Sequence, residues 1–267
     1  MTDKTNARAH WRFLVDSPRP AALNMADDEA ISIAFLNGKV PPTLRLYRWS
    51  FPSISIGSFQ KWEPEWDTLF KEGSIRFVRR ITGGRALLHD RELTYSIVGS
   101  TRDPLFSEGI KGTFYTIAEG LLTGLKSLGV DTNIYAPPRK ERQDHFRNPL
   151  CFASTSWYEI TARGKKLIGS AQRRWVTHFL QHGSLIIETR GIQEFPPSEN
   201  QIGMVELLPQ LPTQERLEKA IQEGFESALS IRLEPGVLTA EEREIANRLV
   251  EKKYGTPAWT LRRDFES

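Results

Sequence analysis

VRRITGGRALLHDRELTYS, residues 78–96, is the stretch that decides the fold. Two runs of β-strand character meet in it, SIRFVRRIT from Ser74 and ELTYSIVGS from Glu92. Between them, Gly83 and Gly84 let the backbone turn tightly and leave N–H groups open to an anionic or carbonyl oxygen. The same stretch is also consistent with a simple glycine hairpin whose arginines are solvated. A single Gly-Gly pair is too weak a motif to distinguish the two.

Further strands and helices flank this stretch. Strands are predicted for TLRLYRW (43–49), SISIGS (53–58) and FLQHGSLIIE (179–188), and SWYEITARGKKLIGSAQRRW (156–175) predicts two strands joined at Arg163-Gly164. Apolar residues at helical spacing predict helices over 23–36, 113–129 and 212–229, and Thr239-Ala240-Glu241-Glu242 has the capping-box pattern of a last helix. In the first helix, the acidic residues 27–29 suit a helix start.

The order of these elements predicts an α+β fold with a mixed, largely antiparallel β-sheet flanked by helices. Strands and helices are interspersed without a regular βαβ rhythm, which argues against a doubly wound parallel sheet. The chain has 267 residues, enough for one sizeable core. We expect a single domain over 1–267, with an α+β core at 1–211 and a helical C-terminal extension at 212–267.

The composition is that of an ordinary soluble globular protein, with 39% hydrophobic residues, 26% charged residues and a mean hydropathy of −0.42. No apolar run approaches the ~20 residues that cross a bilayer, and the first residues lack the apolar segment of a secretory signal. Because a single cysteine cannot form a disulfide within the chain, we expect a cytoplasmic protein.

Neither nucleic acid, a metal nor a cofactor is indicated. The net charge of +3 is small and comes without a basic stripe or a nucleic-acid-binding motif. The sequence also contains no paired cysteines at zinc-binding spacing and no Walker phosphate-binding loop. We therefore expect no metal site, no cofactor, no nucleic-acid partner and no membrane contact.

Four polar residues are candidates for a chemical role by their residue type and local sequence alone. The only cysteine, Cys151 in NPLCFAS (148–154), is either a buried apolar filler or a nucleophile. Strand alternation places Lys166 on the opposite face from Lys165 and Leu167, so one lysine points inward or both are solvated. His89 and His182 lie beside apolar strands, which favours hydrogen-bonding structural residues over catalytic bases.

Four stretches taken together resemble the lipoate-protein ligase and octanoyltransferase family, which shares its catalytic domain with biotin-protein ligases. They are 78–96, CFASTSWYEI (151–160), GKKLIGSAQRR (164–174) and LQHGSLII (180–187). The similarity extends to the closing KYGTPAWTLRR and implies the biotin/lipoate-protein ligase catalytic-domain architecture. Cys151, followed by Phe152 and Ser156-Trp157-Tyr158-Glu159, is similar to the LipM type of octanoyltransferase rather than to the ATP-dependent ligases.

The resemblance implies an acyltransferase that works through its cysteine. Cys151 would accept octanoyl from octanoyl-acyl carrier protein as a thioester and pass it to a lysine on a lipoyl domain, typically of the glycine cleavage H protein. Aminolysis of a thioester runs downhill, so no ATP or cofactor is needed. Lys166 matches the lysine that would stabilise the oxyanion and help hold the thiolate.

The resemblance also implies the residues that bind the acyl substrate. Arg79, Gly83 and Gly84 match the loop that closes on the acyl chain, and His89 with Asp90 completes this signature. Arg85 stands where the ligases have a third glycine, which argues against adenylation. The strand after Lys166 adds Gly169, Ser170 and Ala171 to the expected substrate-binding residues.

Two other functions remain open at this point. The first is an ATP-dependent lipoate-protein ligase in which Cys151 is incidental, and the second is a non-catalytic protein that binds partners through its arginines. The basic loop 136–148, with Arg139, Lys140, Arg142 and Arg147, either steers an acidic acyl carrier protein or is simply solvated. We expect a monomer.

Overall fold

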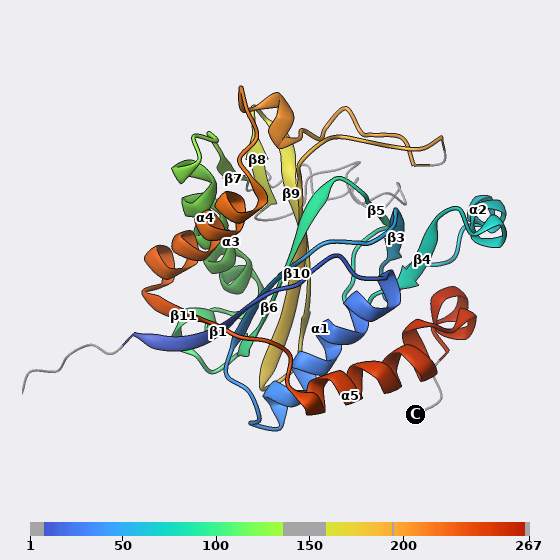
Figure 1. Ribbon diagram of the computed structural model, residues 1–267, viewed down its shortest axis with the longest axis horizontal. Coiled ribbons are helices and arrows are strands. Elements are labelled where there is room, and N and C mark those ends of the chain that lie inside the picture. Colours follow the sequence, from blue (N-terminus) through green and yellow to red (C-terminus); the bar gives the residue numbers. More distant parts are fainter. Residues whose placement is uncertain (1–7, 136–158, 194, 265–267) are drawn as a thin grey trace, which may run out of the picture.

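The structure is a computed structural model that describes residues 8–135, 159–193 and 195–264. Its centre is an eight-stranded sheet (Figure 1), with the strand order β11-β1-β2-β6-β10-β9-β8-β7. These strands are β11 (Ile231–Pro235), β1 (Ala9–Val15), β2 (Thr43–Tyr47), β6 (Glu92–Ser100), β10 (His178–Ile186), β9 (Lys165–Arg174), β8 (Glu159–Ala162) and β7 (Asn133–Tyr135). The first three are parallel and every later neighbour is antiparallel. The predicted α+β fold with a largely antiparallel sheet is confirmed.

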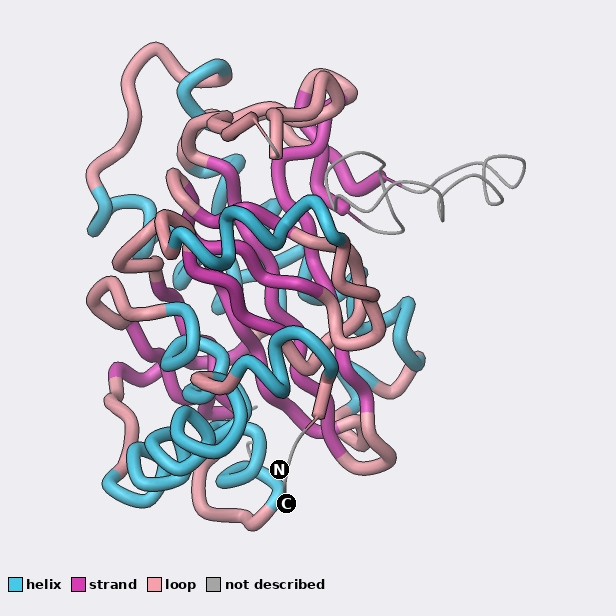
Figure 2. Tube along the Cα trace, turned by 90° about the vertical axis from the view of Figure 1, so that its right-hand side faces the viewer, coloured by secondary structure: helices cyan, strands magenta, loops and turns pink. Residues whose placement is uncertain are grey.

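Helices cover both faces of the large sheet, as Figure 2 shows. α3 (Gly109–Ser127) and α4 (Gln214–Leu229) share one apolar core with the sheet, and α1 (Ala21–Leu36) and α5 (Ala240–Leu249) share a second core with its other face. Each helix was predicted, because each buries an apolar stripe at helical spacing. The capping box of α5 is present, since Thr239 Oγ1 accepts from Glu242 N and the Glu242 carboxylate accepts from Thr239 N.

A three-stranded sheet lies on the far side of the molecule from α3 and α4 (Figure 1). Its order is β4 (Arg76–Arg79), β3 (Ser53–Ile56) and β5 (Leu87–His89), and α2 (Asp67–Glu72) connects β3 to β4. β3 and β4 are parallel, because a crossover connection rather than a hairpin joins them. This small sheet has its own core around Ile54, Ile56 and Trp66.

Short helical segments complete the chain. They are the 3₁₀ turns Pro64–Trp66, Pro104–Phe106 and Met204–Glu206, and the π-helical turns η6 (Val250–Tyr254) and η7 (Ala258–Arg262). No helix within the described residues is both long and apolar enough to cross a bilayer.

Two of the predictions differ from the structure. Residues 212–267 are not purely helical, because β11 lies between α4 and α5 and pairs with β1 in the large sheet. The acidic residues Asp27 and Asp28 are not at the start of α1, which begins at Ala21; both are buried nearly two turns further along. Their charges pair with a buried arginine instead of the helix dipole.

Candidate active site

An inner pocket lies where the large sheet, the small sheet and α1 meet. Apolar side chains form much of its wall: Met25 of α1, Tyr47 and Trp49 at the end of β2, and Leu87 of β5. The other lining residues are Ser55, Arg80, His89, Thr94, Gly169, Ser170, Ala171, His182, Gly183 and Ser184. The structure thus brings together four residues that were predicted to bind substrate, namely His89, Gly169, Ser170 and Ala171. An apolar pocket with a few placed polar groups suits a small apolar ligand.

The Gly83-Gly84 loop packs closely against the turn after β3. A Cβ on Gly57 would lie 1.9 Å from the Gly84 carbonyl oxygen, so only glycine fits there. Gly84 has a φ of +91°, in the region that glycine adopts without strain. Gly83, Gly84 and Arg85 are not among the lining residues of the inner pocket, and their contact with the acyl chain stays a prediction.

Arg80 holds this loop in place and lines the inner pocket. Its guanidinium donates to the carbonyl oxygens of Gly83 at 2.9 Å, Arg85 at 2.8 Å and Ser55 at 2.8 Å. Arg80 was not among the predicted substrate-binding residues, although alternation along the strand puts Arg79 and Arg80 on opposite faces. That alternation was the available signal that one of the two arginines points to the pocket.

Arg79 is held by backbone carbonyl groups, and its predicted contact with the acyl chain stays a prediction. Its buried guanidinium donates to carbonyl oxygens of two segments, including Gly57 at 2.8 Å, Gln60 at 2.6 Å and Thr260 at 3.0 Å. Burial, with the nearby charges of Arg263 and Arg80, lowers the pKa of Arg79 to about 10. Arg79 does not line the inner pocket; it ties the loop after β3 to the C-terminal segment.

His89 forms part of the inner-pocket wall as a neutral ring. It stacks on Trp49 with the ring centroids 3.9 Å apart, and its Nε2 lies 2.8 Å from Ser55 Oγ. Burial lowers the pKa of His89 from its usual value, which keeps the imidazole uncharged at neutral pH. This agrees with the structural, hydrogen-bonding role that its sequence context favoured.

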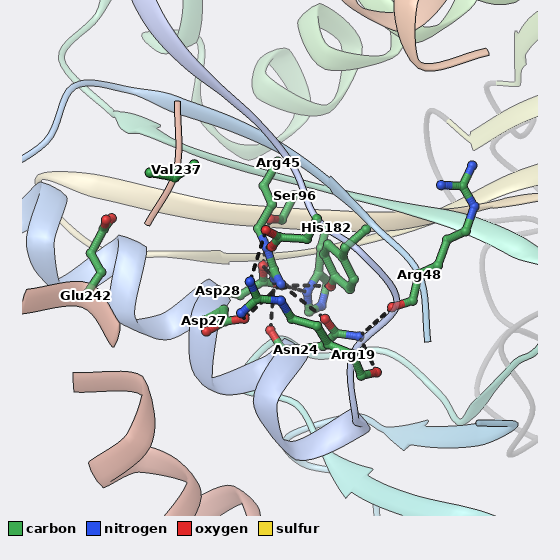
Figure 3. A network of polar contacts seen from close by, with 12 residues as sticks. Arg19, Asn24, Asp27, Asp28, Arg45, Arg48, Ser96, His182, Val237 and Glu242 are labelled. Atoms are coloured by element: carbon green, nitrogen blue, oxygen red, sulfur yellow. Dashed lines mark hydrogen bonds and ion pairs between the residues drawn. The ribbon is translucent and has the colours of Figure 1, made fainter. Parts of the chain in front are cut away.

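A buried charge network supports the opposite wall, at His182 (Figure 3). His182 Nδ1 lies 3.1 Å from Asp28 Oδ2, and His182 Nε2 lies 2.7 Å from Thr82 Oγ1. Thr82 belongs to the loop that contains Gly83 and Gly84, here called the glycine loop. Asp28 also pairs with Arg45 at 2.7 Å. Burial would raise the pKa of Asp28, but the hydrogen bond from His182 and the charge of Arg45 outweigh it, so the pKa is lowered. An ionised Asp28 fixes the ring of His182 and, through it, the loop.

An outer cavity of about 200 Å³ adjoins the inner pocket, and the two share Leu87 and Ser184. Its other lining residues are Ala86, Leu88, Asp90, Arg91, Glu92, Ile186, Glu188, Thr189, Arg190, Phe195, Pro196, Pro197, Ser198 and Gln201. The described residues contain no group of three His, Cys, Asp or Glu side chains placed to hold a metal ion.

Lys166 is fully buried at the start of β9, with its Nζ 2.5 Å from Glu159 Oε1. Of the alternatives left open for Lys165 and Lys166, the structure selects an inward-pointing Lys166 and an exposed Lys165. The backbone of Lys166 bonds to Asn200 and Ile202 on either side of Gln201, which lines the outer cavity. Cys151 and the basic loop 136–148 lie outside the described residues.

Comparisons with known proteins add the identity of the family. Residues 20–198 match the lipoyl protein ligase A/B catalytic domain. The octanoyltransferase LipM of Kyrpidia tusciae is 43% identical to this chain over 275 residues, which cover 95% of this chain and 99% of that protein. The chain belongs to the LipM octanoyltransferase family.

Another LipM relative agrees with this membership, and solved structures of lipoate-protein ligases share the fold. The octanoyltransferase LipM of Bacillus subtilis is 35% identical, covering 95% of this chain and 98% of that protein. A crystal structure of lipoate-protein ligase A bound with ATP has a TM-score of 0.78 at 25% identity, covering 94% of this chain and 98% of that one. Protein Ta0514 from T. acidophilum also has a TM-score of 0.78, at 27% identity, with 94% and 98% covered. As a LipM-family member, the chain is an acyltransferase of protein lipoylation, and the inner pocket is the candidate site for its octanoyl group.

Proposed function

We propose that this octanoyltransferase takes octanoyl from octanoyl-acyl carrier protein onto Cys151 and passes it to a lysine of a lipoyl-domain protein, such as the glycine cleavage H protein. The apolar inner pocket is the observation that carries the proposal, because its walls of Met25, Tyr47, Trp49 and Leu87 are apolar like an acyl chain. The pocket encloses about 30 Å³, so the walls must move apart to admit an octanoyl chain. The 35–43% identity to LipM octanoyltransferases along 95% of the chain supports it further.

The first half-reaction is a thioester exchange. The Cys151 thiolate attacks the acyl carbon of the donor thioester and gives a tetrahedral oxyanion, which collapses by breaking the donor's C–S bond. The donor thiol leaves as a thiolate and takes up a proton from solvent. One thioester replaces another, so the step needs no external source of energy.

The second half-reaction is aminolysis. The neutral ε-amine of the acceptor lysine attacks the Cys151 thioester, the C–S bond breaks and an amide forms. The Cys151 thiolate is regenerated and the amine nitrogen releases one proton. Splitting the transfer in this way lets each of two protein substrates occupy the enzyme in turn.

In this proposal Lys166 stabilises both oxyanions. Three observations support it: the ammonium is fully buried, the Glu159 carboxylate holds it, and later residues of the same strand line the inner pocket. A fixed donor in a water-excluded site stabilises a developing negative charge far better than water does. Glu159 is the first residue of β8 and follows Cys151 by eight positions in the chain. The partner of Lys166 is therefore close in sequence to the proposed nucleophile.

Intact-protein mass spectrometry tests the proposal. The protein is incubated with octanoyl-acyl carrier protein and no ATP, and we expect a mass gain of one octanoyl group that is absent in Cys151→Ser. In Lys166→Ala, both half-reactions should slow by about 10²-fold or more, the scale of losing one oxyanion donor. Activity that requires ATP and survives Cys151→Ser would instead identify an ATP-dependent lipoate-protein ligase.

A further inference from the structure

Glu92 carries a buried charge without a fixed cation. Its side chain is 4% exposed, and both carboxylate oxygens accept hydroxyl hydrogen bonds, Oε1 from Thr94 at 2.6 Å and Oε2 from Ser184. Two accepted O–H bonds fit the ionised, acceptor-only form. No lysine or arginine of the described residues forms an ion pair with Glu92. Buried charges are normally paired, so this carboxylate is a candidate binding site for a cationic group.

His89 does not fill that position. Its Nδ1 lies 3.5 Å from Glu92 Oε1, too far for a hydrogen bond, and this buried nitrogen has no other hydrogen-bond partner among the described residues. The imidazole is neutral, because burial lowers its pKa. The Glu92 carboxylate and the unpartnered Nδ1 of His89 therefore lie side by side where the two cavities adjoin. Glu92 lines the outer cavity, and His89 lines the inner pocket.

The lining of the outer cavity suits a chain with a cationic end. Leu88, Ile186 and Phe195 provide apolar wall for methylene groups. Its two arginines are engaged at the rim with Glu188, which lies 3.0 Å from Arg190 and 3.9 Å from Arg91. Two further carboxylates line the cavity, the exposed Asp90 and the buried Glu92. Glu92 is the one beside Ser184, which also lines the inner pocket.

We propose that the outer cavity admits the lysine side chain of the acceptor and that Glu92 receives its ammonium group. The inference rests on the proposed function and adds the entry route of the second substrate. A primary ammonium on a flexible apolar stem fits this cavity, whereas the buried carboxylate repels an anionic, phosphate-bearing arm. The bound ammonium then lies next to Ser184, where the inner pocket begins, and it loses one proton to solvent before the neutral amine attacks the thioester.

Separate assays of the two half-reactions test Glu92→Gln. We expect acyl-enzyme formation from octanoyl-acyl carrier protein to stay within about threefold, and transfer to Nα-acetyl-lysine amide to fall at least about tenfold, the loss of one charge-assisted hydrogen bond. Release by hydroxylamine, which is neutral at pH 7, should be unchanged. Equal losses for the lysine derivative and hydroxylamine, or no loss for either, would overturn the proposal.

The matched control is Glu218→Gln. Glu218 is also buried, but it pairs with Arg48 at 2.8 Å and lines neither hollow. The same change of charge there should leave the selectivity for the lysine derivative over hydroxylamine at the wild-type value. A loss of that selectivity in Glu218→Gln as large as in Glu92→Gln would refute a specific role of Glu92.

A second measurement uses the wild-type enzyme and does not depend on the folding of a variant. A lipoyl domain with its native lysine and the same domain with Nε-acetyl-lysine compete against transfer to a labelled acceptor. We expect the charged form to inhibit at least about tenfold better, by the same energy scale. Equal inhibition would overturn the role of the ammonium. If no acyl-enzyme forms in the wild type, the proposed function itself has failed.

Discussion

Asp27 and Asp28 are neighbours on α1 and both are buried, yet burial affects their ionisation differently. Asp28 receives bonds from His182, Ser96 and Arg45, and its pKa is lowered. For Asp27, burial outweighs the attraction of Arg45 and Arg19, each 3.0 Å away, and raises the pKa to about 6. The Oδ1 atom of Asp27 has no hydrogen-bond partner among the described residues, which explains why burial dominates there.

The raised pKa of Asp27 predicts that stability decreases from pH 4 to pH 6. The folded protein holds this proton more tightly than the unfolded chain, so the stabilisation is complete below the ordinary pKa of 3.8 and lost as pH rises through about 6. Over that window the unfolding free energy should fall by up to about 3 kcal/mol more in the wild type than in Asp27→Asn. Urea unfolding of both proteins at pH 4 and pH 7 measures the difference. Parallel pH profiles would contradict it.

At the residue scale, the structure brings some of the residues that the resemblance implied to one pocket and leaves others outside it. His89 and the run Gly169 to Ala171 were expected at the substrate and line the inner pocket. The two arginines before the glycine loop show the limit: alternation separates their faces, but only tertiary contacts reveal that Arg80 faces the pocket. Glu92 was not selected, because the cavity beside it is formed by a loop some hundred residues away.

At the scale of elements, α3 and α4 pack at unusually short range because glycines meet at their crossing. A Cβ on Gly224 of α4 would lie 2.4 Å from Gly124 N and 2.5 Å from Gly120 O of α3. These contacts involve backbone atoms, which cannot move aside as a flexible side chain can. The short approach allows Phe225 to fill the core beside Gly120.

Gly224→Ala should therefore destabilise the protein, although alanine favours a helix over glycine by about 1 kcal/mol. We expect the unfolding free energy to fall by about 1–3 kcal/mol, as for other overpacked cores, when measured by urea denaturation. Ser227→Ala, on the exposed side of the same helix, is the control and should change stability by less than about 0.5 kcal/mol. A stabilised Gly224→Ala would show that the helices separate at little cost.

Helix α4 was predicted from its sequence because one face is apolar and the other polar, whereas β1 and β11 were missed. Half-buried strands show the alternation that identifies them, but β1 has four consecutive buried residues and no such pattern. The strand β11 has only five residues and is defined by its pairing with β1, more than two hundred positions earlier. Pairing between residues so far apart in the sequence produces no local pattern from which the strand could be predicted.

On the scale of the whole molecule, the C-terminal segment folds back to hold the base of the glycine loop. Arg79 donates to the carbonyl oxygens of residues 259–261, and Trp259 Nε1 donates back to Arg79 O at 2.7 Å. The same guanidinium bonds to the turn 57–60, which packs against Gly84. The resemblance included KYGTPAWTLRR, but its contact with Arg79 spans 180 positions and is visible only in the fold.

Trp259→Phe tests whether this contact positions the loop, because it removes one donor and keeps an aromatic ring. The buried Arg79 carbonyl loses that bond, which should cost about 1–3 kcal/mol. Because Arg79 joins both segments, we expect faster amide hydrogen exchange at 57–60 and 79–85, and unchanged exchange in β6, β9 and β10 on the opposite side of the pocket. Trp62→Phe is the control, since Trp62 Nε1 donates to the exposed Asp67 at 2.7 Å and not to the loop. Faster exchange spread evenly over both sheets would mean that Trp259 stabilises the whole domain and does not specifically hold the loop that contains Gly83 and Gly84.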